Sequence, residues 1–190
     1  LRIAAAKLFI QTLDDRDKIT VVDFDSVSRV FWPLQSVGAT REQASRSTNN
    51  IDSYGGTNIS AGVSSAFTQL NDNAARRKIG ILLTDGQQER GPYDPRWHRE
   101  FAQRGWPIFT FGLGRGADEV LLRNIATQTN GDYTALNSAD QLVALYNNLR
   151  IRLNSAQSLT SSTVLLQQGE SRTFVTRIPQ NSRSATFITS

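Results

Sequence analysis

The sequence predicts a doubly wound α/β domain over residues 1–153, because apolar segments of strand type and of helix type alternate along it. Residues 79–83 form an unbroken apolar run, which is typical of a central strand buried on both faces of a parallel sheet. Residues 59–70 place Ile59, Val63 and Phe67 on one face of a helix. Residues 107–113 repeat the buried-strand pattern. The crossover rule then predicts a mostly parallel sheet with helices on both faces.

The first part of the chain supplies a helix and a hairpin. Residues 1–13 carry an apolar stripe at helical spacing, and residues 19–24 and 27–32 are strand-like. Pro33 is expected to end the second strand at a sheet edge. Residues 40–52 follow as a polar helix that starts with a capping pattern at Thr40. A glycine-containing loop at residues 53–58 separates this helix from the next.

The second part alternates helices with strands and then changes character. Pro95 suits the first turn of a helix that ends near residue 104, and residues 118–129 form another helix. A short strand at residues 133–136 and a helix starting at Ser138 complete the domain. Beyond residue 153, β-type runs occur without helices between them, so residues 154–190 are expected to begin a β-sandwich-like segment; the runs are 163–167, 172–178 and 185–189.

Composition excludes several classes of function. The 190 residues contain no Cys, so disulfides, thiolate metal sites and a Cys nucleophile are absent from this segment. The net charge is +4, and the basic residues are dispersed among acidic ones, which indicates a solvated surface and no nucleic-acid partner. No apolar run approaches the ~20 residues of a membrane span, so no membrane insertion is expected. The chain starts at Leu1 and lacks Met, which indicates a fragment or a processed product.

Two loops carry the candidate site. Gly55 and Gly56 precede Thr57, and Asp85 directly follows the central strand. Both loops are predicted at the rim where the strands of open α/β sheets end and bind ligands. A hydroxyl and a carboxylate are oxygen donors of the type that a hard divalent cation takes. The alternatives are that Thr57 caps the helix beginning at Ile59 and that Asp85 only caps a turn.

Five motifs in order resemble the von Willebrand factor type A family. They are Asp17 to Phe24, Gly55 to Ile59, Ile81 to Gly86, Pro107 to Gly114 and Asn130 to Tyr133, and the resemblance spans about residues 1–153. It implies a Rossmann-like fold, a non-enzymatic adhesion role and a metal-ion-dependent adhesion site. In that site Thr57 and Asp85 match the family's threonine and aspartate. The metal is expected to be Mg²⁺ (or Ca²⁺ or Mn²⁺), completed by an acidic residue of a protein partner.

The sequence departs from the family in one respect. The family's Asp-x-Ser-x-Ser motif is absent, and it is expected, together with the first strand, upstream of Leu1. The nearest match, residues 24–28, has Phe24 where the aspartate belongs and is followed by a strand-like segment, so it is rejected. Metal binding by this fragment alone is therefore expected to be weak or absent.

Four further expectations concern the location, two rival functions and the single histidine. Residues 151–190 are loosely similar to the segment that follows this domain in calcium-activated chloride channel regulators and related bacterial proteins, which implies an extracellular or cell-surface protein. One rival is a metal-independent scaffold that binds partners through residues 87–95. A remote rival is a haloacid dehalogenase-like phosphatase with Asp23 as nucleophile and Asp25 as acid and base. His98, the only histidine, is expected on the surface.

Overall fold

The structure, a computed structural model, describes residues 2–51, 55–71, 77–137, 141, 145, 167–168 and 170–173. One compact unit spans Leu1–Leu142 and a second spans Val143–Ser190. The predicted helix from Ser138 and the β-type runs of the tail lie almost wholly outside the described residues. The boundary at residue 153 stays a prediction. Within the described residues, no helix is long and apolar enough to cross a membrane.

The predicted hairpin is confirmed, but its second strand is longer than expected. Helix α1 (Arg2–Thr12) leads into β1 (Lys18–Phe24), which pairs antiparallel with β2 (Ser28–Ser36). Strand β2 therefore continues past Pro33, which was expected to end it. Pro33 falls where the register is irregular, between the pairs Ile19–Gln35 and Val21–Trp32. A residue without an N–H group is tolerated at such a break in the ladder.

The polar helix after the hairpin is shorter than predicted. Helix α2 covers Arg41–Ser47, with short 3₁₀ turns η1 (Gly38–Thr40) before it and η2 (Thr48–Asn50) after it. The expected capping pattern is wrong, because the Thr40 hydroxyl donates to the carbonyl oxygen of Ser36 at 2.5 Å and makes no cap hydrogen bond. At the other end, the Thr48 hydroxyl donates to the Ser45 carbonyl oxygen and is fully buried.

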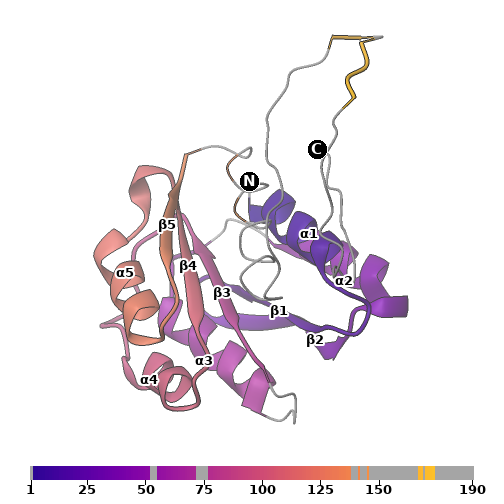
Figure 1. Ribbon diagram of the computed structural model, residues 1–190. Helices are drawn as coiled ribbons and strands as arrows, with labels where there is room; N and C mark the ends of the chain where they lie inside the picture. Colours follow the sequence, from indigo (N-terminus) through magenta and orange to yellow (C-terminus); the bar gives the residue numbers. More distant parts are fainter. Residues whose placement is uncertain are drawn as a thin grey trace, which may run out of the picture. The chain divides into compact units, whose positions relative to one another are not determined.

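The rest of the unit forms the predicted parallel sheet with its helices (Figure 1). Strands β3 (Gly80–Thr84), β4 (Ile108–Leu113) and β5 (Tyr133–Leu136) pair in the order β3-β4-β5. Between them run α4 (Arg96–Gln103), the 3₁₀ turn η3 (Gly114–Gly116) and α5 (Glu119–Gln128). The carboxyl ends of the three strands share one rim, as parallel pairing requires.

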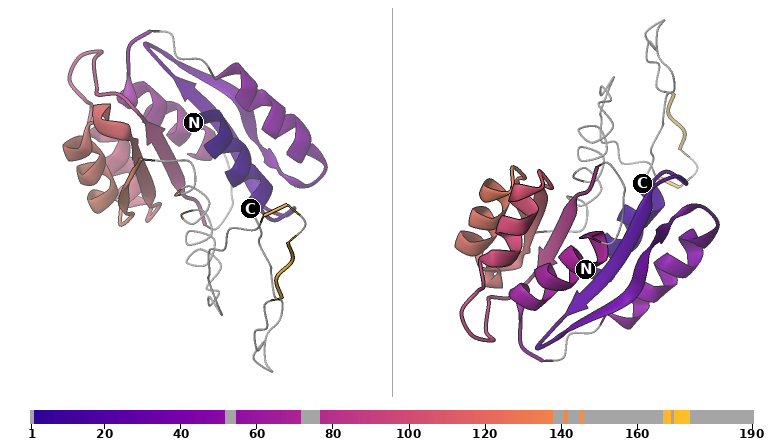
Figure 2. Two further views of the ribbon diagram at one scale, coloured as in Figure 1. Left: turned by 90° about the horizontal axis from the view of Figure 1, so that it is seen from above. Right: turned by 90° about the horizontal axis from the view of Figure 1, so that it is seen from below.

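Helix α3 (Ile59–Asn71) bridges the hairpin and the parallel sheet, which the structure shows as two separate sheets (Figure 2). On the hairpin side, a Cβ placed on Gly62 would lie 2.6 Å from the ring of Phe24, so the helix approaches β1 closely. On the other side, α3 shares one apolar cluster with β3, β4, α4 and α5; its buried members are Ile59, Val63, Phe67, Leu70, Leu82, Phe101, Ile108, Leu122 and Ile125. Burial of this cluster fixes α3 and therefore the loop that precedes it.

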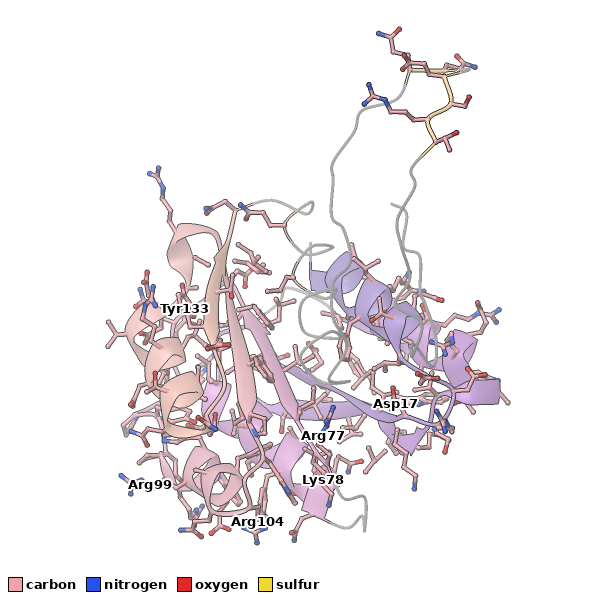
Figure 3. All side chains as sticks on the ribbon, in the orientation of Figure 1. Asp17, Arg77, Lys78, Arg99, Arg104 and Tyr133 are labelled. Atoms are coloured by element: carbon pink, nitrogen blue, oxygen red, sulfur yellow. The ribbon has the colours of Figure 1, made fainter. Side chains whose placement is uncertain are left out.

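A basic and aromatic cluster lies at the start of β3, the opposite end of the strand from the rim (Figure 3). The Nζ of Lys78 donates to the Leu70 carbonyl oxygen at 2.5 Å and lies 4.4 Å from the ring centroid of Trp106. Burial, helped by the charge of Arg104, lowers the pKa of Lys78. Lys78 is thus a buried structural residue, and the solvated surface expected for it is wrong.

Candidate metal site

The end of β3 and the loop before α3 meet directly. The Thr84 hydroxyl oxygen accepts the Gly86 N–H at 3.2 Å, which folds the chain back just after Asp85. A Cβ placed on Gly86 would overlap the hydroxyl oxygen of Thr57. Gly86 does not have a positive φ, so the glycine is needed for this close approach and not for a left-handed turn. The structure therefore brings the Thr57 hydroxyl beside the backbone that follows Asp85.

Asn58, and not Thr57, caps helix α3. The Asn58 Oδ1 accepts the N–H of Ala61 at 3.0 Å, three residues further on, which is the hydrogen bond of an N-cap. Among the described residues, the Thr57 hydroxyl makes no hydrogen bond. The capping alternative for Thr57 is therefore wrong, and its hydroxyl is left to face the rim.

The turn after β4 closes the other side of Asp85. A Cβ on Gly116 would lie 2.6 Å from the Asp85 carbonyl oxygen, so this turn packs against the Asp85 backbone. The Asp118 N–H donates to the Gly86 carbonyl oxygen at 3.4 Å, while the Asp118 carboxylate caps α5 through the Leu121 N–H at 3.0 Å. The side chain of Asp85 itself is exposed. The turn after β4 therefore packs on the backbone of Asp85, while the residue as a whole stays exposed to solvent.

The hairpin turn between β1 and β2 also reaches the rim. The Ser26 hydroxyl oxygen accepts the Gly56 N–H and the Arg90 Nε–H, each at 3.1 Å. The Asp25 carboxylate is bound by its own neighbours in the chain: it accepts the Val27 N–H at 2.8 Å and pairs with Arg29 at 2.6 Å. The hydrogen bond from Arg29 is the main reason that the pKa of Asp25 is lowered. The rejected Asp-x-Ser-x-Ser match therefore contributes one serine to the rim, and the strand that follows it is confirmed as β2.

The loop after β3 is anchored by a buried histidine. His98 is 0% exposed, which makes the expected surface position wrong. The His98 Nε2 lies 2.7 Å from Gln128 Oε1, and the His98 Nδ1 lies 3.0 Å from the Tyr93 hydroxyl. Gln128 uses its amide nitrogen to donate to Asn124, so its oxygen faces His98 and assigns the proton of neutral His98 to Nε2. Burial is the main reason that the pKa of His98 is lowered.

The oxygen donors of Thr57 and Asp85 fit a hard divalent cation, which prefers hydroxyl, carboxylate and water oxygens. The described residues contain no group of three or more His, Cys, Asp or Glu side chains that could hold a metal ion. Two protein donors leave most positions of a six-coordinate ion to water or to other groups.

Sequence reasoning placed Thr57 and Asp85 but missed three side chains that build the rim around them. Ser26, Glu89 and Arg90 come from two different loops. Ser26 accepts the Gly56 N–H, Glu89 accepts the Thr57 N–H, and Arg90 donates to Ser26. No periodicity or spacing indicates such contacts. The one available signal was the pair of serines in residues 24–28, of which Ser26 reaches the rim while Ser28 contacts Ser65 on α3 at 2.8 Å.

A family model and several solved structures are similar to this chain. A family model for the von Willebrand factor type A domain matches residues 2–148. A von Willebrand factor type A structure from Catenulispora acidiphila is similar, with 22% identity and a TM-score of 0.72 over 78% of this chain and 36% of its own. The vWF domain of the type V pili tip protein Mfa5 from Porphyromonas gingivalis has 13% identity and a TM-score of 0.64, over 84% of this chain and 90% of its own.

A third similar structure is described by its name as holding a metal ion. Proximal thread matrix protein 1 from the mussel byssus, with a zinc-occupied MIDAS motif, has 21% identity and a TM-score of 0.65, over 78% of this chain and 41% of its own. This chain thus spans 36% and 41% of the length of the first and third structures. A comparison with curated proteins gave no match. Because these identities are low, the similarity to solved structures establishes the fold of this chain and nothing further.

Proposed function

This chain belongs to the von Willebrand factor type A domain family, and from that premise we propose that it is a protein-interaction and adhesion module that uses a divalent metal held by Thr57 and Asp85. The observation that supports this most is the contact of the Thr57 hydroxyl with Gly86, directly after Asp85. The Thr57 hydroxyl lies against the residue that follows Asp85, and Asn58 supplies the N-cap of α3 in its place.

The residues have separate roles in this proposal. Thr57 supplies a hydroxyl oxygen and Asp85 supplies its carboxylate, directly or through a water molecule. When bound, Mg²⁺ (or Ca²⁺ or Mn²⁺) supplies a positive centre that attracts the exposed acidic residue of a protein partner. Asn58, Gly86 and Gly116 hold the two donors in place and contribute no ligand.

Domains of this family are generally interaction modules without enzymatic activity, and we propose the same for this chain. The only histidine cannot serve as an exposed general base, because both of its ring nitrogens are hydrogen-bonded inside the protein. Asp23, the nucleophile of the phosphatase rival, is buried within β1, and a strand follows it where that motif requires a helical segment. The phosphatase function is therefore not proposed.

We also propose an extracellular or cell-surface location. Two proteins of similar fold are a byssus matrix protein and a pilus tip protein.

A metal-independent scaffold is the second candidate, and one observation favours it. The described residues contain no group of three or more His, Cys, Asp or Glu side chains that could hold a metal ion, and the Glu89 carboxylate beside Thr57 accepts the Thr57 N–H. In this case the loop of residues 87–95, which exposes Glu89 and Arg90, would bind the partner without a metal.

Calorimetric titration of the full-length protein with Mn²⁺ separates the two candidates. The metal proposal predicts that Thr57→Ala and Asp85→Ala each weaken Mn²⁺ binding at least about tenfold, since each removes one of few protein donors. Thr127→Ala, which truncates an exposed threonine on α5, serves as the matched control and should bind normally. No Mn²⁺ binding by the unaltered protein, or equal binding by all variants, would favour the scaffold.

A further inference from the structure

The segment that follows the candidate site folds back over the start of α3. We call residues 88–94 the strap. The Glu89 N–H donates to the Thr57 carbonyl oxygen at 2.8 Å, and the Thr57 N–H donates to the Glu89 carboxylate Oε2 at 3.1 Å. Both backbone polar groups of Thr57 are thus held by a single residue of the strap. A hydrogen bond to an ionised carboxylate is stronger than one between neutral groups.

The strap is itself fixed on both sides of Glu89. The Gln88 Oε1 accepts the Ser60 N–H at 3.3 Å, and the Asp94 N–H donates to the Ser60 hydroxyl oxygen at 2.8 Å. The Gln88 side-chain amide also donates to the carbonyl oxygens of Arg90 and Gly91, at 3.2 and 3.3 Å. These bonds limit where the Glu89 carboxylate can lie, although its side chain is exposed.

The glycine before Thr57 makes room for this arrangement. A Cβ on Gly56 would lie 2.7 Å from the Glu89 Oε2 and 2.9 Å from the Arg90 Nε. Gly56 has no positive φ, so it is required by the two side chains that pack on it. The second glycine of the Gly-Gly-Thr loop and the strap therefore form one unit around Thr57.

We propose that Glu89 is a positioning residue for Thr57. Its carboxylate fixes the Thr57 backbone, which keeps the hydroxyl beside Gly86 and so raises the affinity of the metal site. A donor that is already oriented loses less freedom on binding an ion than one that must first be ordered. This inference rests on the proposed metal function for its effect on affinity. It assigns Glu89 a hydrogen-bond acceptor role and not a place among the metal ligands.

The test compares Glu89→Ala with Glu89→Gln, since glutamine keeps an acceptor oxygen and removes the charge. In Mn²⁺ calorimetry on the full-length protein, Glu89→Ala should bind about tenfold more weakly, as expected for a lost hydrogen bond to a charged group. Glu89→Gln should keep the affinity within about threefold of the unaltered protein, because it retains an acceptor oxygen. The small loss is expected because a neutral acceptor is weaker than a charged one. Glu100→Ala, which removes a carboxylate paired with Arg104 on α4, is the control and should change nothing.

Two results would overturn the inference. If Glu89→Gln binds Mn²⁺ as weakly as Glu89→Ala, the charge or direct ligation matters and the hydrogen bond does not. If Glu89→Ala binds normally, Glu89 has no effect on the site. Circular dichroism of each variant checks that the fold is retained.

A second measurement separates this inference from the proposed function. Amide hydrogen exchange of Thr57 is followed in the metal-free protein, where the Thr57 N–H should exchange about tenfold faster in Glu89→Ala than in the unaltered protein or Glu89→Gln. If the unaltered protein binds no Mn²⁺, the metal function fails and the exchange rate alone decides whether Glu89 positions Thr57. Equal exchange in the three proteins would overturn the positioning role.

Discussion

The hydroxyl oxygen of Thr57 lies against the backbone of Gly86, so closely that position 86 has no room for a side chain. The two residues are separated by the whole of α3 and β3. Their contact joins the Gly-Gly-Thr loop to the end of β3, which was predicted as a central strand and lies at the edge of the described sheet β3-β4-β5. It is the link on which the proposed metal site depends.

Gly86→Ala should destabilise the protein by about 1–3 kcal/mol, as overpacking of a filled space does. The cost should fall in the Thr57→Ala background, because the oxygen that the new Cβ would meet is gone. Urea unfolding of the two single variants and the double variant gives the coupling free energy. Strictly additive costs would contradict the close contact.

Asn58→Ala should lower the free energy of unfolding by about 1 kcal/mol through loss of the N-cap. Asn58→Asp keeps the Oδ1 acceptor and should stay near the unaltered protein. Thr57→Ala should cost less than about 0.5 kcal/mol, since its hydroxyl caps nothing. A loss for Thr57→Ala equal to that for Asn58→Ala, in the same urea titration, would assign the cap to Thr57.

Stability should fall on acidification because of His98. Burial lowers the pKa of His98 in the folded protein below the unfolded value of about 6.5, with Arg99 adding to the effect and the Gln128 hydrogen bond opposing it. Between these two pKa values the unfolded chain binds more protons than the folded protein. The contribution of neutral His98 to the free energy of unfolding is therefore complete above about pH 6.5 and is lost as the pH falls toward the folded pKa. Each unit of pKa shift corresponds to about 1.4 kcal/mol.

The measurement is urea unfolding between pH 7.5 and pH 5 for the unaltered protein and for His98→Gln. The variant cannot titrate, so the difference between the two profiles isolates the histidine from the carboxylates. Since the chain has one histidine, its imidazole NMR signals report the folded pKa directly. Parallel stability profiles and an ordinary imidazole pKa would contradict the buried, doubly hydrogen-bonded state.

The sequence predicted what depends on local pattern. The apolar run of β3, the apolar face of α3 and the resemblance of the loops to a family were sufficient to place Thr57 and Asp85 at one rim. Contacts between distant loops were not predictable, because a single sequence carries no pairing information for Glu89 with Thr57 or for Arg90 with Ser26.

The errors have the same origin. His98 lies among charged residues in the sequence, and its burial arises from Tyr93 and Gln128, which come from a separate loop and helix. Pro33 was expected to end a strand, but an irregular register accommodates it. Tertiary contacts decided both outcomes against local propensity.

The most direct test of the central claim is to add Mn²⁺ to the ¹⁵N-labelled full-length protein and follow paramagnetic broadening of its amide signals. The shared site predicts that the amides of Thr57 and Asp85 broaden first and together, and that Thr57→Ala weakens the broadening at both. Sharp signals for these two amides, with broadening centred on other residues, would contradict a metal site at this rim.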